Sequence, residues 1–171
     1  AWRTRGAIAK VSHMKMIRIM ALPLLLAMYG SAWGGIEEGF TAVSRGDYAT
    51  AIREWRPLAE QGDANAQHNL GVIYEYGYGV PVDYKEAMNW YLKAAEQGLA
   101  ASQYNLGVMY NNGEGVTRNY VQAHKWFNIA GEHGIKDINQ NLEVVARKMT
   151  PAQISEAQSL AREWLRKHPR R

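Results

Sequence analysis

Apolar residues recur at helical spacing through the middle of the chain, and between residues 62 and 134 the same pattern occurs twice. Residues 62–97 align with residues 98–133 without a gap, at a shift of 98 − 62 = 36 positions. The shared residues, numbered in the first copy, are Gln67, Asn69, Leu70, Gly71, Val72, Tyr74, Gly77, Gly79, Val80, Tyr84, Ala87, Trp90, Ala94 and Glu96. A fixed period of this length predicts a stacked repeat protein, in which each unit buries one face against its neighbours.

Each unit is predicted to form a helical hairpin. The apolar side of the first helix, in residues 63–76, consists of Ala66, Leu70, Ile73 and Tyr74. Gly77 and Gly79 end this helix, one of them in the left-handed conformation. Asp83 then caps a second helix, and Glu86 is placed to complete a capping box. The apolar stripe of the second helix consists of Ala87, Trp90, Tyr91 and Ala94.

Two glycines lie in the middle of the predicted first helices, at Gly71 and Gly107. A glycine in a helix interior costs about 0.5–1 kcal/mol relative to alanine. That cost is acceptable where a bulky side chain must approach the backbone. We expect Trp90 and Trp126 to be the side chains that do so.

The two units resemble the Sel-one-like (SLR) repeat family, which is related to the tetratricopeptide repeats. The motif A-x-x-x-L-G-x-x-Y runs from Ala66 to Tyr74, and a looser copy runs from Ser102 to Tyr110. G-x-G-V follows at residues 77–80 and again at residues 113–116. The resemblance implies an all-α fold, an α/α solenoid of stacked antiparallel helical hairpins. It also implies a scaffold that mediates protein–protein interaction.

Less regular segments flank the repeats. Residues 33–61 are predicted to be a degenerate N-terminal repeat with helices at 37–45 and 47–61. Phe40 and Val43 should point inward in the first of these helices, and Pro57 should interrupt or bend the second. The repeats themselves are assigned to residues 62–97 and 98–134. Residues 135–171 are predicted to form a C-terminal capping hairpin and a basic tail, with Thr150 as the cap of the last helix.

The N-terminus has the features of a secretory signal. Residues 1–13 are interpreted as read-through upstream of the true start, and residues 14–32 as a signal peptide. Lys15 and Arg18 precede an apolar run at 19–28, and small residues lead to a cleavage site after Ala32. The alternative is a short membrane anchor, although the run is shorter than the ~20 residues of a spanning helix. The expected location is periplasmic or secreted, with membrane contact only through the transient signal segment.

Charge and composition narrow the classes of function. The formal net charge is +4, but residues 33–171 hold 15 of the 20 Lys and Arg and all 16 acidic residues, which gives 15 − 16 = −1. The excess of positive charge therefore belongs to residues 1–32, ahead of the predicted mature chain, and nucleic-acid binding loses its support. The chain has no cysteine, which excludes disulfides and thiolate metal sites.

Motifs for catalysis or cofactor binding are not found. Ser12 and Lys15 form an S-x-x-K motif, but it falls at the signal segment and is interpreted as coincidence. The histidines after the signal, His68, His124, His133 and His168, show no metal-ligand spacing. We therefore predict no enzyme activity, no metal and no cofactor. Glu75 and Glu114 lie at loop edges, which favours a binding protein over an envelope glycan-binding or hydrolytic protein, the runner-up.

The predicted function is capture of a protein or peptide partner in a concave groove formed by the first helices. The candidate partner-binding residues are Asn65, His68, Asn69, Tyr76, Tyr104, Asn105 and Asn112. Asn69 and Asn105 recur unchanged, so they either hold a ligand's peptide backbone or bond a neighbouring helix. A basic C-terminal patch includes Arg162, Arg166 and Lys167. It is either a solvated helix end or a contact for an anionic lipid or glycan.

Overall fold

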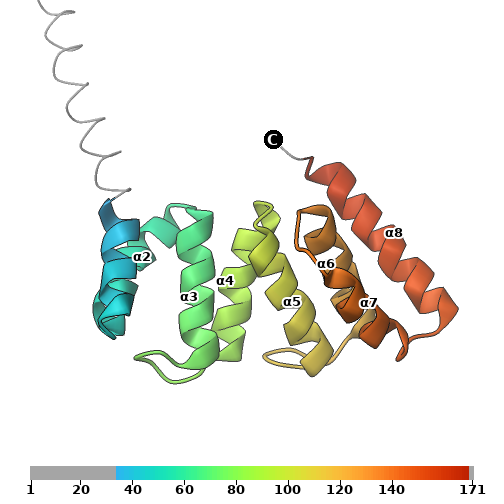
Figure 1. Ribbon diagram of the computed structural model, residues 1–171, viewed down its shortest axis with the longest axis horizontal. Coiled ribbons are helices and arrows are strands. Elements are labelled where there is room, and N and C mark those ends of the chain that lie inside the picture. Colours follow the sequence, from blue (N-terminus) through green and yellow to red (C-terminus); the bar gives the residue numbers. More distant parts are fainter. Residues whose placement is uncertain (1–33, 170–171) are drawn as a thin grey trace, which may run out of the picture.

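The computed structural model describes residues 34–169, and all the regular structure within that range is helical (Figure 1). The helices are residues 34–44, α2 (Tyr48–Glu60), α3 (Ala64–Tyr76), α4 (Tyr84–Glu96), α5 (Ala100–Asn112), α6 (Tyr120–Glu132), α7 (Ile138–Ala146) and α8 (Pro151–Lys167). The all-α class predicted from the sequence is confirmed. The segments interpreted as read-through and signal peptide, and the last two arginines, lie outside the described residues.

The helices are stacked in chain order from one end of the molecule to the other (Figure 1). Within the repeats α3 packs on α4 and α5 on α6, while α2 packs on α3 and α4 on α5 between units. Buried side chains accordingly form three clusters along the stack rather than one centre. This arrangement is the predicted solenoid, since each hairpin buries its apolar face against the next.

The predicted C-terminal pair of helices is present as α7 and α8. α8 packs against α6, where Trp164 meets Trp126 edge to face with ring centroids 5.8 Å apart. Thr150 Oγ1 and the Gln153 side chain form the predicted capping box at the start of α8. The last helix therefore covers the apolar side of the second repeat.

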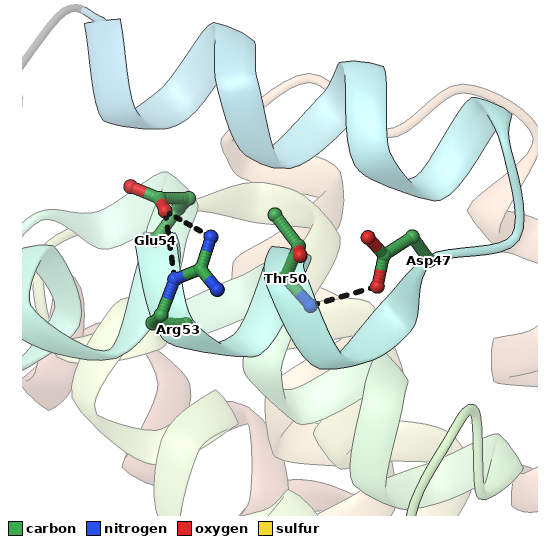
Figure 2. Close-up of polar contacts among 4 residues, drawn as sticks. All are labelled: Asp47, Thr50, Arg53 and Glu54. Carbon is green, nitrogen blue, oxygen red and sulfur yellow. Dashed lines mark hydrogen bonds and ion pairs between the residues drawn. The ribbon is translucent and has the colours of Figure 1, made fainter.

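Short polar side chains begin most of the helices. At the start of α2, Asp47 Oδ1 accepts a hydrogen bond from Thr50 N at 3.0 Å (Figure 2). That bond holds the pKa of the Asp47 carboxyl below its usual value. Asp63, Asp83 and Asn119 cap α3, α4 and α6 in the same way. Glu86 does not serve the predicted capping box, because its carboxylate accepts a hydrogen bond from the Trp90 indole at 2.9 Å.

The sequence predicted an interruption or a bend near Pro57, and the interruption is wrong. α2 runs unbroken from Tyr48 to Glu60 with Pro57 inside it. A proline removes one backbone hydrogen bond, here the bond that the Arg53 carbonyl would accept. Arg53 lies on the exposed side of α2, next to Glu54 (Figure 2), where water can satisfy that carbonyl.

The two mid-helix glycines make room for rings, but the rings differ from those predicted. A Cβ on Gly71 would lie 2.5 Å from the Tyr91 ring, and one on Gly107 would lie 2.5 Å from the Phe127 ring. Trp90 and Trp126, the predicted neighbours, are buried elsewhere in the stack. Helix packing at this distance favours glycine, because any side chain there would force the ring or the backbone to shift.

The predicted orientation of Phe40 is also wrong, since its side chain is 48% exposed. The buried side of helix 34–44 is formed by Gly35, Gly39 and Ala42 instead. A Cβ on Gly39 would lie only 2.1 Å from Trp55 Nε1, so the indole occupies the place of a side chain there. Phe40 contacts the same indole edge to face at 5.3 Å.

We predict that Gly107→Ala destabilises the fold, although alanine favours helices by about 1 kcal/mol. The added methyl group collides with the Phe127 ring, and overpacking of this kind costs about 1–3 kcal/mol. Thermal unfolding followed by circular dichroism should show a lower midpoint. Gly34→Ala is the matched control, because a Cβ there has no neighbour closer than 4.0 Å.

Gly107→Ala should lower the thermal midpoint less in a Phe127→Leu background than in wild type, because the two changes act on one contact. An increase in stability for Gly107→Ala alone would contradict the packing described here.

Candidate functional site

The first helices of successive units form one continuous surface, which we call the first-helix face. His68 Nδ1 on α3 lies 2.8 Å from Ser102 Oγ on α5. On the other side of α5, Asn141 Nδ2 of α7 donates to the Tyr104 hydroxyl at 3.4 Å. α3, α5 and α7 are thus neighbours through their side chains. The candidate residues predicted from the sequence belong to this face or to the ends of its helices.

A cleft of about 470 Å³ lies between α5 and α7, and we call it the α5–α7 cleft. Its lining residues are Tyr104, Val108, Asn111, Phe127, Gln140, Asn141, Val144 and Val145. The residues from α5 follow at i, i+4 and i+7, so they lie along one stripe of that helix. Phe127 and Val145 are buried beneath it, while Val144 is 45% exposed. The cleft therefore has an apolar floor with amide groups along its rim.

Fixed contacts hold the rim of the α5–α7 cleft in place. The Tyr104 ring packs on Phe127 with centroids 5.6 Å apart. Asn111 Oδ1 lies 3.5 Å from the ammonium of Lys148, which also stands over the Tyr120 ring. The cleft is therefore preformed, with a cation at the end marked by Asn111.

The two recurring asparagines have different surroundings. Asn105 faces the hydroxyl of Tyr91, so it is engaged by a neighbouring helix. Asn69 Nδ2 is buried and has no hydrogen-bond partner. The repeat explains the difference, because the residue equivalent to Tyr91 one unit earlier (91 − 36 = 55) is Trp55, which has no hydroxyl. For Asn105 the scaffold role is the one that the geometry supports.

The remaining candidates divide between buried and open positions. His68 is half-buried in its bridge to Ser102, and burial lowers the pKa of its imidazole. Asn65 is exposed on α3. Tyr76 and Asn112, at the ends of α3 and α5, are also exposed, and the Asn112 amide donates to Glu114 Oε1 at 3.1 Å. Of the seven candidates, only Tyr104 lines the cleft.

The carboxylates at the loop edges are closer together than the sequence suggests. Glu75 Oε2 accepts a hydrogen bond from the Tyr91 hydroxyl at 2.5 Å. Burial, with a smaller repulsion from Glu114, raises the pKa of Glu75 above its usual value, while the bond from Tyr91 opposes the rise. Neither carboxylate lines the α5–α7 cleft. The two carboxylates therefore belong to a part of the surface separate from that cleft.

Within residues 34–169 the histidines are not grouped with other metal-ligating side chains. His124 is buried at the position equivalent to Met88, its Nδ1 lies 2.8 Å from Asn128 Nδ2, and burial lowers its pKa. Across residues 34–169 the structure brings together no three side chains of the metal-ligating types. In the same range, none of the helices combines the length and the apolar character of a transmembrane span.

Comparison with known proteins identifies the repeats. The Sel1 repeat family matches residues 64–99 and 100–135, two adjacent units of the length found here. The chain contains two Sel1 repeats. No curated protein matches the chain.

Solved structures share the fold of this Sel1-repeat chain. One is a protective antigen present in uropathogenic Escherichia coli strains, described as displaying an SLR fold, with 34% identity and a TM-score of 0.77. Another is a Sel1 repeat protein from Oxalobacter formigenes, with 29% identity and a TM-score of 0.60. The matches cover 83% and 74% of this chain but only 31% and 54% of the other two. This chain thus spans about a third of the first protein and about half of the second.

Sequence analysis missed the half of the cleft that α7 provides. The repeats were aligned only as far as Gly134, where the regular pattern stops. A further shift of 36 positions places Asn141, Leu142 and Val144 opposite Asn105, Leu106 and Val108. α7 is therefore the first helix of a partial third Sel1-like unit, and this short match was the available signal.

We predict that Glu75→Gln raises the thermal midpoint at neutral pH. The Glu75 carboxylate is charged and half-buried there, whereas the amide is neutral and its oxygen can still accept the bond from Tyr91. The pKa of Glu75 is higher in the folded protein than in the unfolded chain. The folded protein therefore gains stability as the pH falls through that raised pKa, and the gain is complete below 4.5, the pKa of Glu75 in the unfolded chain. The advantage of the variant should accordingly shrink towards about pH 4.

Thermal unfolding between about pH 4 and pH 8 measures this advantage. Glu132→Gln, at an exposed position on α6, is the control. A difference in thermal midpoint between Glu75→Gln and wild type that stays constant over this whole pH range would contradict a raised pKa for Glu75.

Proposed function

We propose that this Sel1-repeat chain holds an extended peptide segment of a protein partner in the α5–α7 cleft. Sel1 repeats generally act as protein–protein interaction scaffolds. The observation that supports this particular site is the cleft itself, which combines an apolar floor with a rim of amides. Family members of this kind are typically not catalytic, which agrees with a binding role.

The chemistry of the cleft suits a peptide. Its volume of about 470 Å³ lies within the range of ligand pockets and admits one or two side chains. Asn111, Gln140 and Asn141 offer both amide donors and carbonyl acceptors, which a peptide backbone requires. An apolar side chain that covered the half-exposed Val144 would contribute about 1 kcal/mol through the area removed from water.

The asparagine expected to hold a peptide backbone is then Asn141 rather than Asn105. The two occupy equivalent positions one unit apart, since 105 + 36 = 141. Asn105 is engaged by Tyr91, whereas Asn141 lies on the rim of the cleft with a single long bond to Tyr104. Tyr104 keeps its place among the candidate residues as the other side of that rim.

The proposed place of action is the periplasm or the exterior of a bacterium-like cell. The support is the basic, apolar and small-residue sequence of residues 14–32, which has the order of a secretory signal.

The peptide proposal can be tested with a random twelve-residue peptide library panned against residues 33–171. We expect enriched peptides with an apolar anchor residue, and Val144→Asp should weaken their binding about tenfold or more. Gln158→Asp adds the same charge at an exposed position of α8 and should leave affinity unchanged. Peptides bound equally by Val144→Asp and wild type would show that the cleft is not the site.

The location can be tested by expressing the whole chain in a Gram-negative bacterium. Mass spectrometry of the periplasmic fraction should find a mature protein beginning at Trp33. Ala32→Arg places a large charged residue before the cleavage site, so it should leave the signal attached. Recovery of the uncleaved wild-type chain in the cytoplasm would refute the proposal.

A further inference from the structure

Three tyrosines form a stack at one end of the first-helix face, away from the α5–α7 cleft. The rings of Tyr48 and Tyr78 are nearly parallel, with centroids 4.9 Å apart and an angle of 11°. Tyr76 continues the stack at 5.7 Å and 21° from Tyr78. Tyr76 is 59% exposed and Tyr78 is 40% exposed. We call these three residues the tyrosine stack.

The scaffold does not need aromatic residues at positions 76 and 78, whereas Tyr48 is a repeat position that recurs as Tyr84 and Tyr120. Shifts of 36 place Asn112 and Glu114 at the positions of Tyr76 and Tyr78, and the second repeat folds with the same helix lengths. Exposed aromatic rings that do not support the fold are typical of contact surfaces. The tyrosine stack is therefore a feature that distinguishes one unit from the other.

Two carboxylates lie beside the stack. The loops that follow α3 and α5 lie on the same edge of the molecule (Figure 1), and they bring Glu114 close to the end of α3. The negative charges of Glu75 and, more weakly, Glu114 raise the pKa of the Tyr76 hydroxyl. None of the ion pairs found in residues 34–169 includes Glu75 or Glu114. Their negative charge therefore faces the exposed ring of Tyr76 without a partner cation.

We propose that the tyrosine stack, together with Glu75 and Glu114, receives an arginine side chain of the peptide partner. This inference rests on the proposed function and adds a second contact to it. A guanidinium group stacks on an aromatic face and bonds carboxylates through paired N–H donors. Lysine offers a point charge without the planar face, so arginine fits both parts of the surface better.

Charge favours a cation over a neutral glycan. Exposed tyrosines can also stack on sugar rings, but a sugar would leave Glu75 and Glu114 repelling each other. A guanidinium group neutralises that repulsion, which adds to the larger effect of burial in raising the pKa of Glu75. The surface is thus complementary to a positive charge.

Side-chain hydrogen bonds join this surface to the cleft. Asn111, on the rim of the α5–α7 cleft, donates to Asn112 Oδ1 at 2.9 Å. Asn112 in turn donates to Glu114 Oε1 at 3.1 Å. The three side chains form a polar track from the cleft to the carboxylates. One extended peptide can therefore place an apolar side chain in the cleft and an arginine at the tyrosine stack.

The test uses the small probe N-acetyl-arginine amide, observed by NMR of isotope-labelled protein. We expect shifts at residues 75–78 and 113–115, with a dissociation constant on the order of millimolar. The citrulline analogue has nearly the same shape but no charge, and should bind about tenfold more weakly. Equal binding of the two probes would overturn the proposal.

Protein variants then locate the site. Glu75→Gln combined with Glu114→Gln should abolish the shifts, and so should Tyr76→Ala combined with Tyr78→Ala. Glu96→Gln combined with Glu132→Gln removes the same charge from exposed positions elsewhere and should leave probe binding unchanged. Equal losses of probe binding in the Glu75→Gln/Glu114→Gln variant and in this control would show only a general effect of protein charge, and would overturn the proposed site.

Two further arms separate the possible outcomes. Changes in the NMR signals of the tyrosine stack with neutral chitotriose, but not with the arginine probe, would indicate a glycan ligand instead of an arginine and overturn the inference. Val144→Asp should leave binding of the small probe intact, because that probe does not reach the cleft. If the arginine probe fails while cleft-binding peptides still bind, this inference is wrong and the proposed function stands.

Discussion

The contact between a mid-helix glycine and an aromatic ring of the next helix sets the geometry of each hairpin. Gly71 with Tyr91 and Gly107 with Phe127 hold the two helices of a unit so close that a single methyl group has no room. The unit can then repeat, because the outer sides of both helices are left to bury against the neighbours. Helix 34–44 uses the same device in Gly39 and Trp55. Close approach within hairpins thus makes stacking between hairpins possible.

The choice of ring at this contact has consequences for the surface. Phe127 is wholly apolar, and with α5 and α7 it forms the floor of the cleft. Tyr91 occupies the same position one unit earlier, but its hydroxyl donates to Glu75 and faces Asn105. The Tyr91 hydroxyl therefore adds a polar contact among α3, α4 and α5 at a position that otherwise serves only apolar packing. The two repeats share a backbone, and they differ in chemistry where the first-helix face is open.

The sequence was sufficient to predict the hairpins because their limits depend on local chemistry. Asp63, Asp83 and Asn119 cap helices, and Gly77 and Gly113 end them with φ values of 70° and 79°. The ring opposite each glycine was predicted wrongly because Trp90 and Tyr91 are adjacent in one apolar stripe. Periodicity shows that both are buried, but it does not show which of them faces its own hairpin. That depends on the packing of three helices at once.

The surroundings of the candidate site residues were harder to predict, because they depend on what the neighbouring helix leaves free. His68 looks available on an isolated helix, yet it is occupied by Ser102 of the next unit. Asn105 is engaged by a hydroxyl that its counterpart Asn69 lacks. Tyr104 lines the α5–α7 cleft, but the opposite side of that cleft comes from α7, whose repeat pattern is too short to recognise on its own.

The cleft and the tyrosine stack both lie where the repeat departs from regularity. α7 has 9 residues instead of 13, and Glu143 stands where the earlier units have Gly71 and Gly107. No ring can approach α7 at that position in the manner of Tyr91 or Phe127, and α8 packs against α6. α7 can therefore leave Val144 exposed over the cleft. In the same way, Tyr76 and Tyr78 are free to face solvent because the scaffold is complete without them. In a solenoid the regular positions are committed to stacking, so a regular residue such as Val144 becomes exposed where the neighbouring unit is incomplete.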